Sequence, residues 1–216
     1  MKRIVIVGAG GHGKVVADLV RAAGVFEIAA FADELALQRD GDLYLGVRVL
    51  AGDDALARAR SLGVDHALAA FGDCTARLGC CERLIANGFE IISAVHPRAV
   101  VSPDVSIGAG TVVAAGAVVC AAAYLGESVI VNTGATVDHD CVVDDGVHLE
   151  PGVHLAGSVR VGRGSTVGIG AVVVKGVRIG AHSHVGAGAV VTRDLPDGVV
   201  AWGVPARVIR PTSVRG

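Results

Sequence analysis

The sequence predicts a chain of two parts. Residues 1–94 form a small α/β domain with a Rossmann-like parallel sheet, and residues 95–216 form an all-β, left-handed parallel β-helix of hexapeptide repeats. Three observations carry this prediction: a six-residue aliphatic period in the second part, alternating strand and helix patterns in the first, and only 3% aromatic residues. The 52% hydrophobic content excludes a disordered chain, and glycine without a G-X-Y period excludes collagen.

The repeat of the second part runs without interruption. Every sixth residue is aliphatic at seventeen successive positions: Val95, Val101, Ile107, Val113, Val119, Leu125, Val131, Val137, Val143, Leu149, Leu155, Val161, Val167, Val173, Ile179, Val185 and Val191. This period matches neither the two-residue period of a strand nor the 3.6 residues of a helix. It predicts a triangular coil of three hexads with the aliphatic side chains inside and about 4.8 Å between coils. A purely structural solenoid, an ice-binding protein or a coat protein is the alternative, but the exposed positions are irregular.

Strand and helix patterns alternate in the first part, which is typical of a parallel sheet. The predicted strands are 4–7, 28–32, 67–71 and 89–94, and the predicted helices are 14–23 and 75–87. This part looks too short for a full six-stranded dinucleotide-binding domain.

A glycine-rich loop follows the first predicted strand. Gly8, Gly10 and Gly13 match G-x-G-x-x-G, and Asp33 follows Gly13 by 20 residues. Backbone N–H groups at a helix N-terminus hold phosphates, and such an acid meets a ribose hydroxyl. NAD, a nucleotide sugar and a purely structural glycine turn all fit this motif, and we favour the nucleotide sugar. His12 inside the loop places a ring close to that ligand.

Charge and cysteine usage bound the partners and the compartment. A net charge of −2 gives no reason to expect nucleic acid. The five cysteines have no CxxC spacing, which indicates reduced thiols and neither a disulfide framework nor a zinc site. The uncharged stretch 105–126 keeps the six-residue period and is read as core, not as a membrane span. The N-terminal apolar run is too short for a signal peptide, so we expect a cytoplasmic protein.

The most polar break in the repeat is Asp138-His139-Asp140, and His148 follows nine residues after His139. A histidine beside a carboxylate suits general-base chemistry, because the imidazole titrates near neutrality and the acid raises its basicity. His154, His182 and His184 are interpreted as solvated surface residues of the coil.

Several motifs together resemble the NeuD/PglD-like family of sugar acetyltransferases, in particular its branch of nucleotide-amino-sugar N-acetyltransferases. They are VGAGGHGKVV, AAFGD, VHPRAVVSPDVSIGAGTVV, NTGATVDHDCVVDDGVHLEPGVHLAG and WGVPARVIR, and they span essentially the whole chain. The resemblance implies a homotrimer with active sites between neighbouring β-helices. It also implies acetyl-CoA as co-substrate, with no permanently bound cofactor, a nucleotide-linked amino sugar as acceptor, and a place in surface-polysaccharide or glycan biosynthesis.

The same resemblance implies roles for individual residues. His139 is matched to the catalytic base and Asp140 to the acid that raises its basicity, where the family often has Glu. The positions matched to acetyl-CoA binding are His148, Gly157, Ile169 and Gly203. Those matched to nucleotide-sugar binding are Gly11, His12, Gly13, Asp33, Glu34, Gly72 and Asn132. Three rival interpretations are an O-acetyltransferase of a sialic-type acid, a non-catalytic scaffold and an NAD-dependent enzyme.

Overall fold

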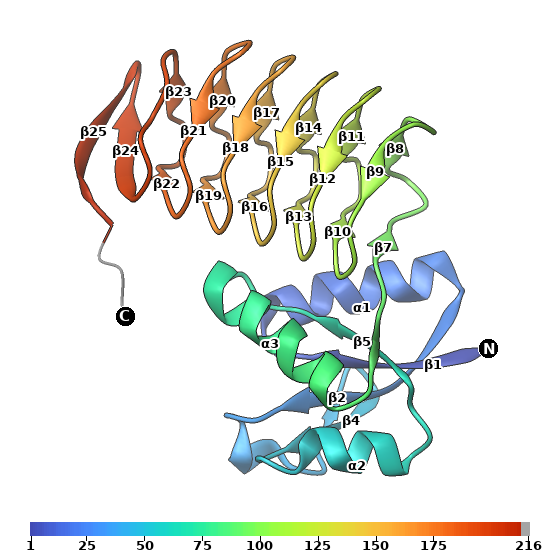
Figure 1. Cartoon of the computed structure of the whole chain (residues 1–216). Helices are drawn as coiled ribbons and strands as arrows, with labels where there is room; N and C mark the ends of the chain where they lie inside the picture. Colours follow the sequence, from blue (N-terminus) through green and yellow to red (C-terminus); the bar gives the residue numbers. More distant parts are fainter. Residues whose placement is uncertain (213–216) are drawn as a thin grey trace. The chain divides into compact units, whose positions relative to one another are not determined.

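The computed structural model describes residues 1–212 and consists of two compact units, Met1–Pro97 and the residues from Arg98 onward. Figure 1 shows the sheet and helices of the first unit in blue to green and the stacked coils of the second in green to red. No helix among residues 1–212 is long and apolar enough to cross a membrane.

The first unit contains a six-stranded sheet in the order β3-β4-β2-β1-β5-β6. Its strands are β1 (Lys2–Val7), β2 (Phe26–Asp33), β3 (Leu43–Tyr44), β4 (Val47–Ala51), β5 (His66–Ala69) and β6 (Glu90–Ile91). All pairs are parallel except β3 with β4. The Rossmann-like parallel sheet is therefore confirmed. The sheet reaches six strands within this short part because two of the strands have only two residues each.

Three α-helices and one short 3-10 helix accompany this sheet. They are α1 (Gly11–Ala23), η1 (Leu37–Arg39), α2 (Ala55–Ser61) and α3 (Cys74–Ala86). Helix α1 begins three residues before the predicted start, inside the glycine loop. A side chain at Gly13 would collide with the carbonyl oxygen of Gly8, so only glycine allows the first turn to pass this close to the end of β1. The predicted strand 89–94 is divided into β6 and a separate strand β7 (Ala94–Val95).

The second unit is a stack of two-residue strands on three faces. The first face, called the valine face below, consists of β8 (Val100–Val101), β11 (Val118–Val119), β14 (Thr136–Val137), β17 (His154–Leu155), β20 (Val172–Val173) and β23 (Val190–Val191). The second consists of β9 (Ser106–Ile107), β12 (Tyr124–Leu125), β15 (Val142–Val143), β18 (Arg160–Val161) and β21 (Arg178–Ile179). The third includes β10 (Val112–Val113), β13 (Ile130–Val131), β16 (His148–Leu149), β19 (Thr166–Val167), β22 (His184–Val185), β24 (Val199–Gly203) and β25 (Ala206–Pro211).

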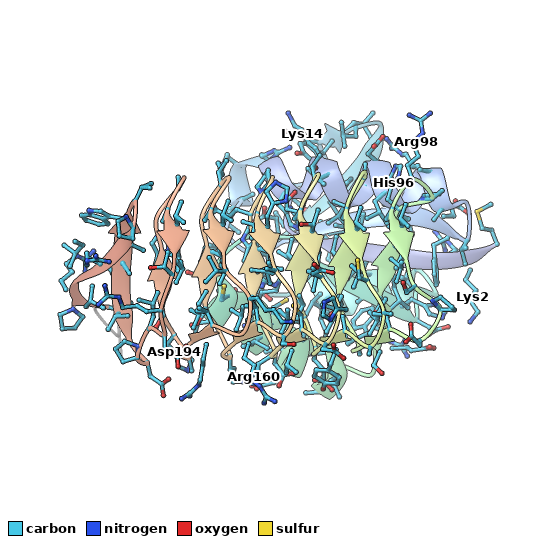
Figure 2. The ribbon with its side chains drawn as sticks, turned by 90° about the horizontal axis from the view of Figure 1, so that it is seen from above. Lys2, Lys14, His96, Arg98, Arg160 and Asp194 are labelled. Carbon is cyan, nitrogen blue, oxygen red and sulfur yellow. The ribbon has the colours of Figure 1, made fainter. Side chains whose placement is uncertain are left out.

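Parallel pairing fixes the register of the stack at three hexads. Val113 pairs with Val131, and Val137 pairs with Leu155, each 18 residues further on. Seen from above, the coils lie side by side in sequence order, and the labelled Arg160 projects outward from them (Figure 2). The hairpin of β24 and β25 is antiparallel and follows the last coils.

The aliphatic column lies inside this stack, as the period predicts. Every member of the column from Val113 to Val191 is at most 1% exposed. The three members before Val113 are only partly buried. Each hexad thus buries its own aliphatic side chain, and the core grows one coil at a time.

Candidate functional site

A pocket of about 520 Å³ lies in the first unit, at the carboxyl ends of β1, β2 and β5 and at the N-terminal turns of α1 and α3. Its lining residues are Val7, Gly8, Gly10, Gly11, His12, Ala32, Asp33, Glu34, Leu35, Ala70, Phe71, Gly72, Ala76 and Arg83. The carboxyl edge of a parallel sheet beside a glycine-rich helix start is where nucleotides bind in such folds. The volume lies within the range of small-molecule sites.

The pocket brings together most of the residues matched to nucleotide-sugar binding. Gly11, His12, Asp33, Glu34 and Gly72 all line it. Gly13 is buried and does not line the pocket. Its lack of a side chain lets α1 pass close to the Gly8 carbonyl. Asn132 belongs to the second unit and is described with that unit.

Asp33 holds the glycine loop with its carboxylate. Its Oδ2 accepts a hydrogen bond from the Ala9 N–H at 3.0 Å, and its Oδ1 accepts one from the Leu35 N–H at 3.2 Å. Two further side chains bind the same loop: Arg39 donates to the Ala9 carbonyl and the Tyr44 hydroxyl donates to the Gly10 carbonyl. Three side chains therefore fix the backbone of Ala9 and Gly10.

Arg83 is a pocket residue that the sequence motifs missed. It lies near the end of α3 and pairs with Glu34, Nη2 to Oε2 at 3.2 Å. The two residues are 49 positions apart, and no short motif links them. The pair places one positive and one negative group at the pocket. The glycine motif alone predicts only backbone N–H groups there.

His12 is partly buried in the first turn of α1. Burial, and after it the positive charge of Arg77, lowers the pKa of His12 from 6.5 to about 4. The imidazole is therefore neutral at pH 7 and can donate or accept a hydrogen bond in the pocket without adding a charge.

The His139 turn follows β14 on the coil. His139 Nδ1 lies 2.7 Å from Asp140 Oδ2, and the His139 backbone N–H donates to Asp138 Oδ1 at 2.8 Å. Asp140 has a φ of 59°, the left-handed conformation in which Asp is one of the better tolerated non-glycine residues. The shorter Asp side chain thus reaches the imidazole, and the proton on Nδ1 leaves the lone pair of Nε2 available.

Gly157, one coil after His139, makes room for the imidazole ring. A Cβ at position 157 would lie 2.5 Å from His139 Nε2 and 2.6 Å from Cε1. The Ser158 N–H donates to the His139 carbonyl at 2.9 Å, and the Gly157 carbonyl accepts from the Gly176 N–H at 3.0 Å. The Gly157 N–H has no hydrogen-bond partner among residues 1–212, which leaves one donor beside Nε2.

Asn132 and His148 form a second polar pair in the coil. Both are buried on the third face, and the Asn132 amide nitrogen lies 3.2 Å from His148 Nε2. Asn132 Oδ1 accepts from the Thr133 N–H at 2.8 Å, which assigns the amide nitrogen as the group facing the ring. An amide nitrogen can only donate, so His148 Nε2 is the acceptor and its ring proton lies on Nδ1.

The two remaining residues matched to acetyl-CoA binding lie further along the chain. The Ile169 N–H donates to Glu150 Oε2 at 2.9 Å, and its side chain is exposed. Gly203 ends β24 with a φ of 103°, and the exposed Val204 follows it.

The three histidines interpreted as solvated are indeed exposed: His154, His182 and His184. His154 also bonds the Thr136 hydroxyl, Nδ1 to Oγ1 at 2.9 Å, and lines a pocket of about 400 Å³ on the valine face with Asp138 and Cys120. Among residues 1–212, no group of three or more His, Cys, Asp or Glu side chains is placed to hold a metal ion.

These features define a class: proteins that join a Rossmann-like domain to a hexapeptide-repeat β-helix with a histidine–carboxylate turn. Residues 3–84 match the PglD N-terminal domain, and residues 158–193 match the bacterial transferase hexapeptide (six repeats). A histidine-to-alanine variant of GDP-perosamine N-acetyltransferase from Caulobacter crescentus, in complex with CoA and GDP-perosamine, is 43% identical to this chain with a TM-score of 0.92. That match covers 97% of this chain and 98% of that one. This chain belongs to the family of left-handed β-helix sugar N-acetyltransferases that includes that enzyme.

Two further relatives agree with this assignment. The acetyltransferase domain of PglB from Neisseria gonorrhoeae FA1090 is 40% identical with a TM-score of 0.89, and the match covers 97% of this chain and 100% of that one. UDP-N-acetylbacillosamine N-acetyltransferase from Bacillus subtilis (strain 168) is 42% identical over 114 residues, which cover 51% of this chain. The match spans 50% of the length of that curated relative.

Proposed function

We propose that the protein is an acetyl-CoA-dependent N-acetyltransferase acting on a nucleotide-linked amino sugar, a UDP-, GDP- or dTDP-4-amino-4,6-dideoxy sugar. The observation that carries the proposal is the His139–Asp140 pair with Nε2 directed over Gly157. Relatives similar over almost the whole chain support the substrates, since one is bound to CoA and GDP-perosamine and another to acetyl coenzyme A.

His139 is the general base of direct acetyl transfer. Its Nε2 takes a proton from the acceptor amine as the amine nitrogen attacks the thioester carbonyl carbon, forming the C–N bond. Asp140, hydrogen-bonded to Nδ1, stabilises the imidazolium that forms. The C–S bond then breaks, and the imidazolium returns the proton to the CoA thiolate. The net reaction converts amine and acetyl-CoA into amide and CoA thiol.

The Gly157 N–H stabilises the oxyanion of the tetrahedral intermediate. This donor has no partner among the described residues 1–212 and lies beside the ring that carries the base. A pre-positioned donor of this kind lowers the barrier where negative charge develops on the carbonyl oxygen. Gly157 therefore has two functions, space for the imidazole and a hydrogen bond for the intermediate.

The pocket of the first unit holds the nucleotide part of the acceptor. Gly11 and the start of α1 face the diphosphate, because a helix N-terminus attracts anions. His12, Asp33, Glu34 and Gly72 form the remainder of this site, and Gly13 shapes the loop beneath it.

The residues assigned to the donor lie on the coil. His148, with its tautomer set by Asn132, binds the acetyl and pantetheine end of acetyl-CoA. Asn132 also faces the acceptor amine. Ile169 and Gly203 lie along the remainder of CoA. Both are exposed, so the Ile169 side chain and the Gly203 backbone are accessible to it.

The protein works as a homotrimer in the cytoplasm, in the synthesis of a surface polysaccharide or other glycan. The valine face supports assembly, because it exposes apolar side chains, among them Val100 and Val172. The five free cysteines suit a reducing compartment.

Release of CoA thiol tests the proposal. The purified chain is mixed with acetyl-CoA and a panel of nucleotide-linked 4-amino-4,6-dideoxy sugars, and His139→Ala is the matched control. Thiol release with one panel member, abolished in the control, supports N-acetylation. Silence across the panel together with release on a sialic-type acid would transfer the assignment to O-acetylation. Acetyl-CoA binding without turnover of either substrate class would favour the scaffold.

A further inference from the structure

Arg77 is a buried charged residue that the proposed mechanism does not use. It lies in α3, is 1% exposed and is the largest fully buried residue among residues 1–212. A buried guanidinium is costly unless strong hydrogen bonds replace its water, so its contacts indicate its role.

Arg77 hydrogen-bonds the segment that leads from β5 to α3. Its Nη1 donates to the Phe71 carbonyl and to the Gly72 carbonyl, each at 3.0 Å. The Arg77 backbone N–H donates to the Asp73 carbonyl at 3.0 Å, and Asp73 Oδ1 accepts from the Ala76 N–H at 2.8 Å. The helix cap and the guanidinium together hold residues 71–73 in one conformation.

This segment forms part of the nucleotide pocket, and Arg77 itself does not. Phe71, Gly72 and Ala76 line the pocket, whereas Arg77 is not among the lining residues. The guanidinium thus lies behind the wall, binding carbonyls whose residues face the ligand. Its charge also lowers the pKa of His12, a second residue that lines the pocket.

We infer that Arg77 is a positioning residue for the nucleotide sugar: its guanidinium holds the Phe71–Gly72 segment in the conformation that binds the nucleotide, without touching the ligand. The inference rests on the proposed function, which assigns this pocket to the acceptor. Lysine is a poor replacement, because its ammonium ends a flexible stem and lacks the rigid guanidinium plane that fixes Nη1 against the two carbonyls.

The test compares Arg77→Lys and Arg77→Met with the wild-type chain in steady-state kinetics. We expect the KM for the nucleotide sugar to rise about tenfold in Arg77→Met, the size expected when a charge-assisted hydrogen bond is lost. In Arg77→Lys it should rise less. The kcat and the KM for acetyl-CoA should stay within about threefold, because the donor site and His139 are on the other unit. Isothermal titration with GDP, UDP and dTDP measures nucleotide binding without turnover.

Arg58→Met is the matched control. Arg58 also lies on a helix of the first unit, donates to a backbone carbonyl, that of Ala51, and pairs with Asp40, but it does not line the pocket. Its kinetic constants should match those of the wild type.

The outcomes separate this inference from the proposed function. Wild-type turnover of a nucleotide sugar with an unchanged nucleotide-sugar KM in folded Arg77→Lys and Arg77→Met overturns the inference alone. Equal increases in both KM values, or a lower active fraction with unchanged KM values, mean a general structural role and also overturn it. A wild-type chain that neither turns over nucleotide sugars nor binds GDP, UDP or dTDP overturns both. If Arg77→Met does not fold, Arg77→Lys decides.

Discussion

Gly157→Ala tests the geometry of the base through a single methyl group. The added Cβ would lie 2.5 Å from His139 Nε2, whereas ordinary contact begins at about 3.4 Å. The ring must therefore move by about 1 Å, and a displacement of this size costs a rate factor on the order of 10². We expect kcat to fall about 100-fold, or about 2.7 kcal/mol in transition-state stabilisation.

The same substitution should leave the fold intact. Gly157 has no positive φ, so alanine can adopt its backbone conformation without strain. The three nearest atoms to the new methyl belong to a half-exposed ring. The assay is CoA release under saturating substrates, with thermal unfolding measured in parallel. Gly79→Ala controls for the change of residue type, because this helical glycine has no atom within 4 Å of the added Cβ apart from the backbone of its own helix.

The double variant decides whether the effect passes through His139. If Gly157→Ala acts by displacing the ring, adding it to His139→Ala should reduce the rate no further than His139→Ala alone. Wild-type turnover in a folded Gly157→Ala protein would refute the geometric argument. Fully additive losses would mean that the added methyl group lowers the rate independently of His139 and would also contradict the argument.

Three further predictions follow from the two sites. His139→Ala should lower kcat by roughly 10²–10⁴-fold in the CoA-release assay, the usual contribution of a general base, and undiminished turnover would remove it from that role. His12→Ala should raise the KM for the nucleotide sugar and leave that for acetyl-CoA unchanged, with His182→Ala as an exposed control; equal changes in both would contradict a dedicated acceptor site. The stability of the first unit should fall as the pH drops from 6.5 to 4. In this range His12 is protonated in the unfolded chain but stays neutral in the folded one, where its pKa is about 4. The loss approaches about 3 kcal/mol below pH 4 and should be absent in His12→Asn, which denaturant titrations at several pH values would measure.

The site was only partly predictable from the sequence. His139 and Asp140 are adjacent, so their pairing follows from local chemistry, and the G-x-G-x-x-G motif correctly indicated the pocket at the start of α1. The motif did not indicate that both oxygens of Asp33 bind backbone N–H groups, or that Glu34 meets Arg83. The Asp33–Ala9 and Glu34–Arg83 contacts join residues 24 and 49 positions apart, so they exist only once β1 pairs with β2 and α3 packs on the sheet.

The sequence by itself determined the β-helix. Each hexad forms its own strand and turn and buries its own aliphatic residue. The hydrophobic pattern of the sequence and the strands of the coil therefore repeat every six residues. The edge strands of the first sheet were not predicted from the sequence and depend on tertiary structure. The strands β3 and β6 have two residues each and α2 has seven, too few for a periodic signal, and they form because the neighbouring sheet offers hydrogen bonds and apolar surface.

Tertiary structure alone placed the site residues that are not neighbours in the chain. The coil register puts Gly157 under the His139 ring, and the same register brings Asn132 to His148. The fold of the first unit carries Arg77 behind the wall that Phe71 and Gly72 present to the pocket. The physical reason is the range of the interactions: periodicity and adjacency act along the chain, whereas these contacts exist only after coils stack and a helix packs on its sheet.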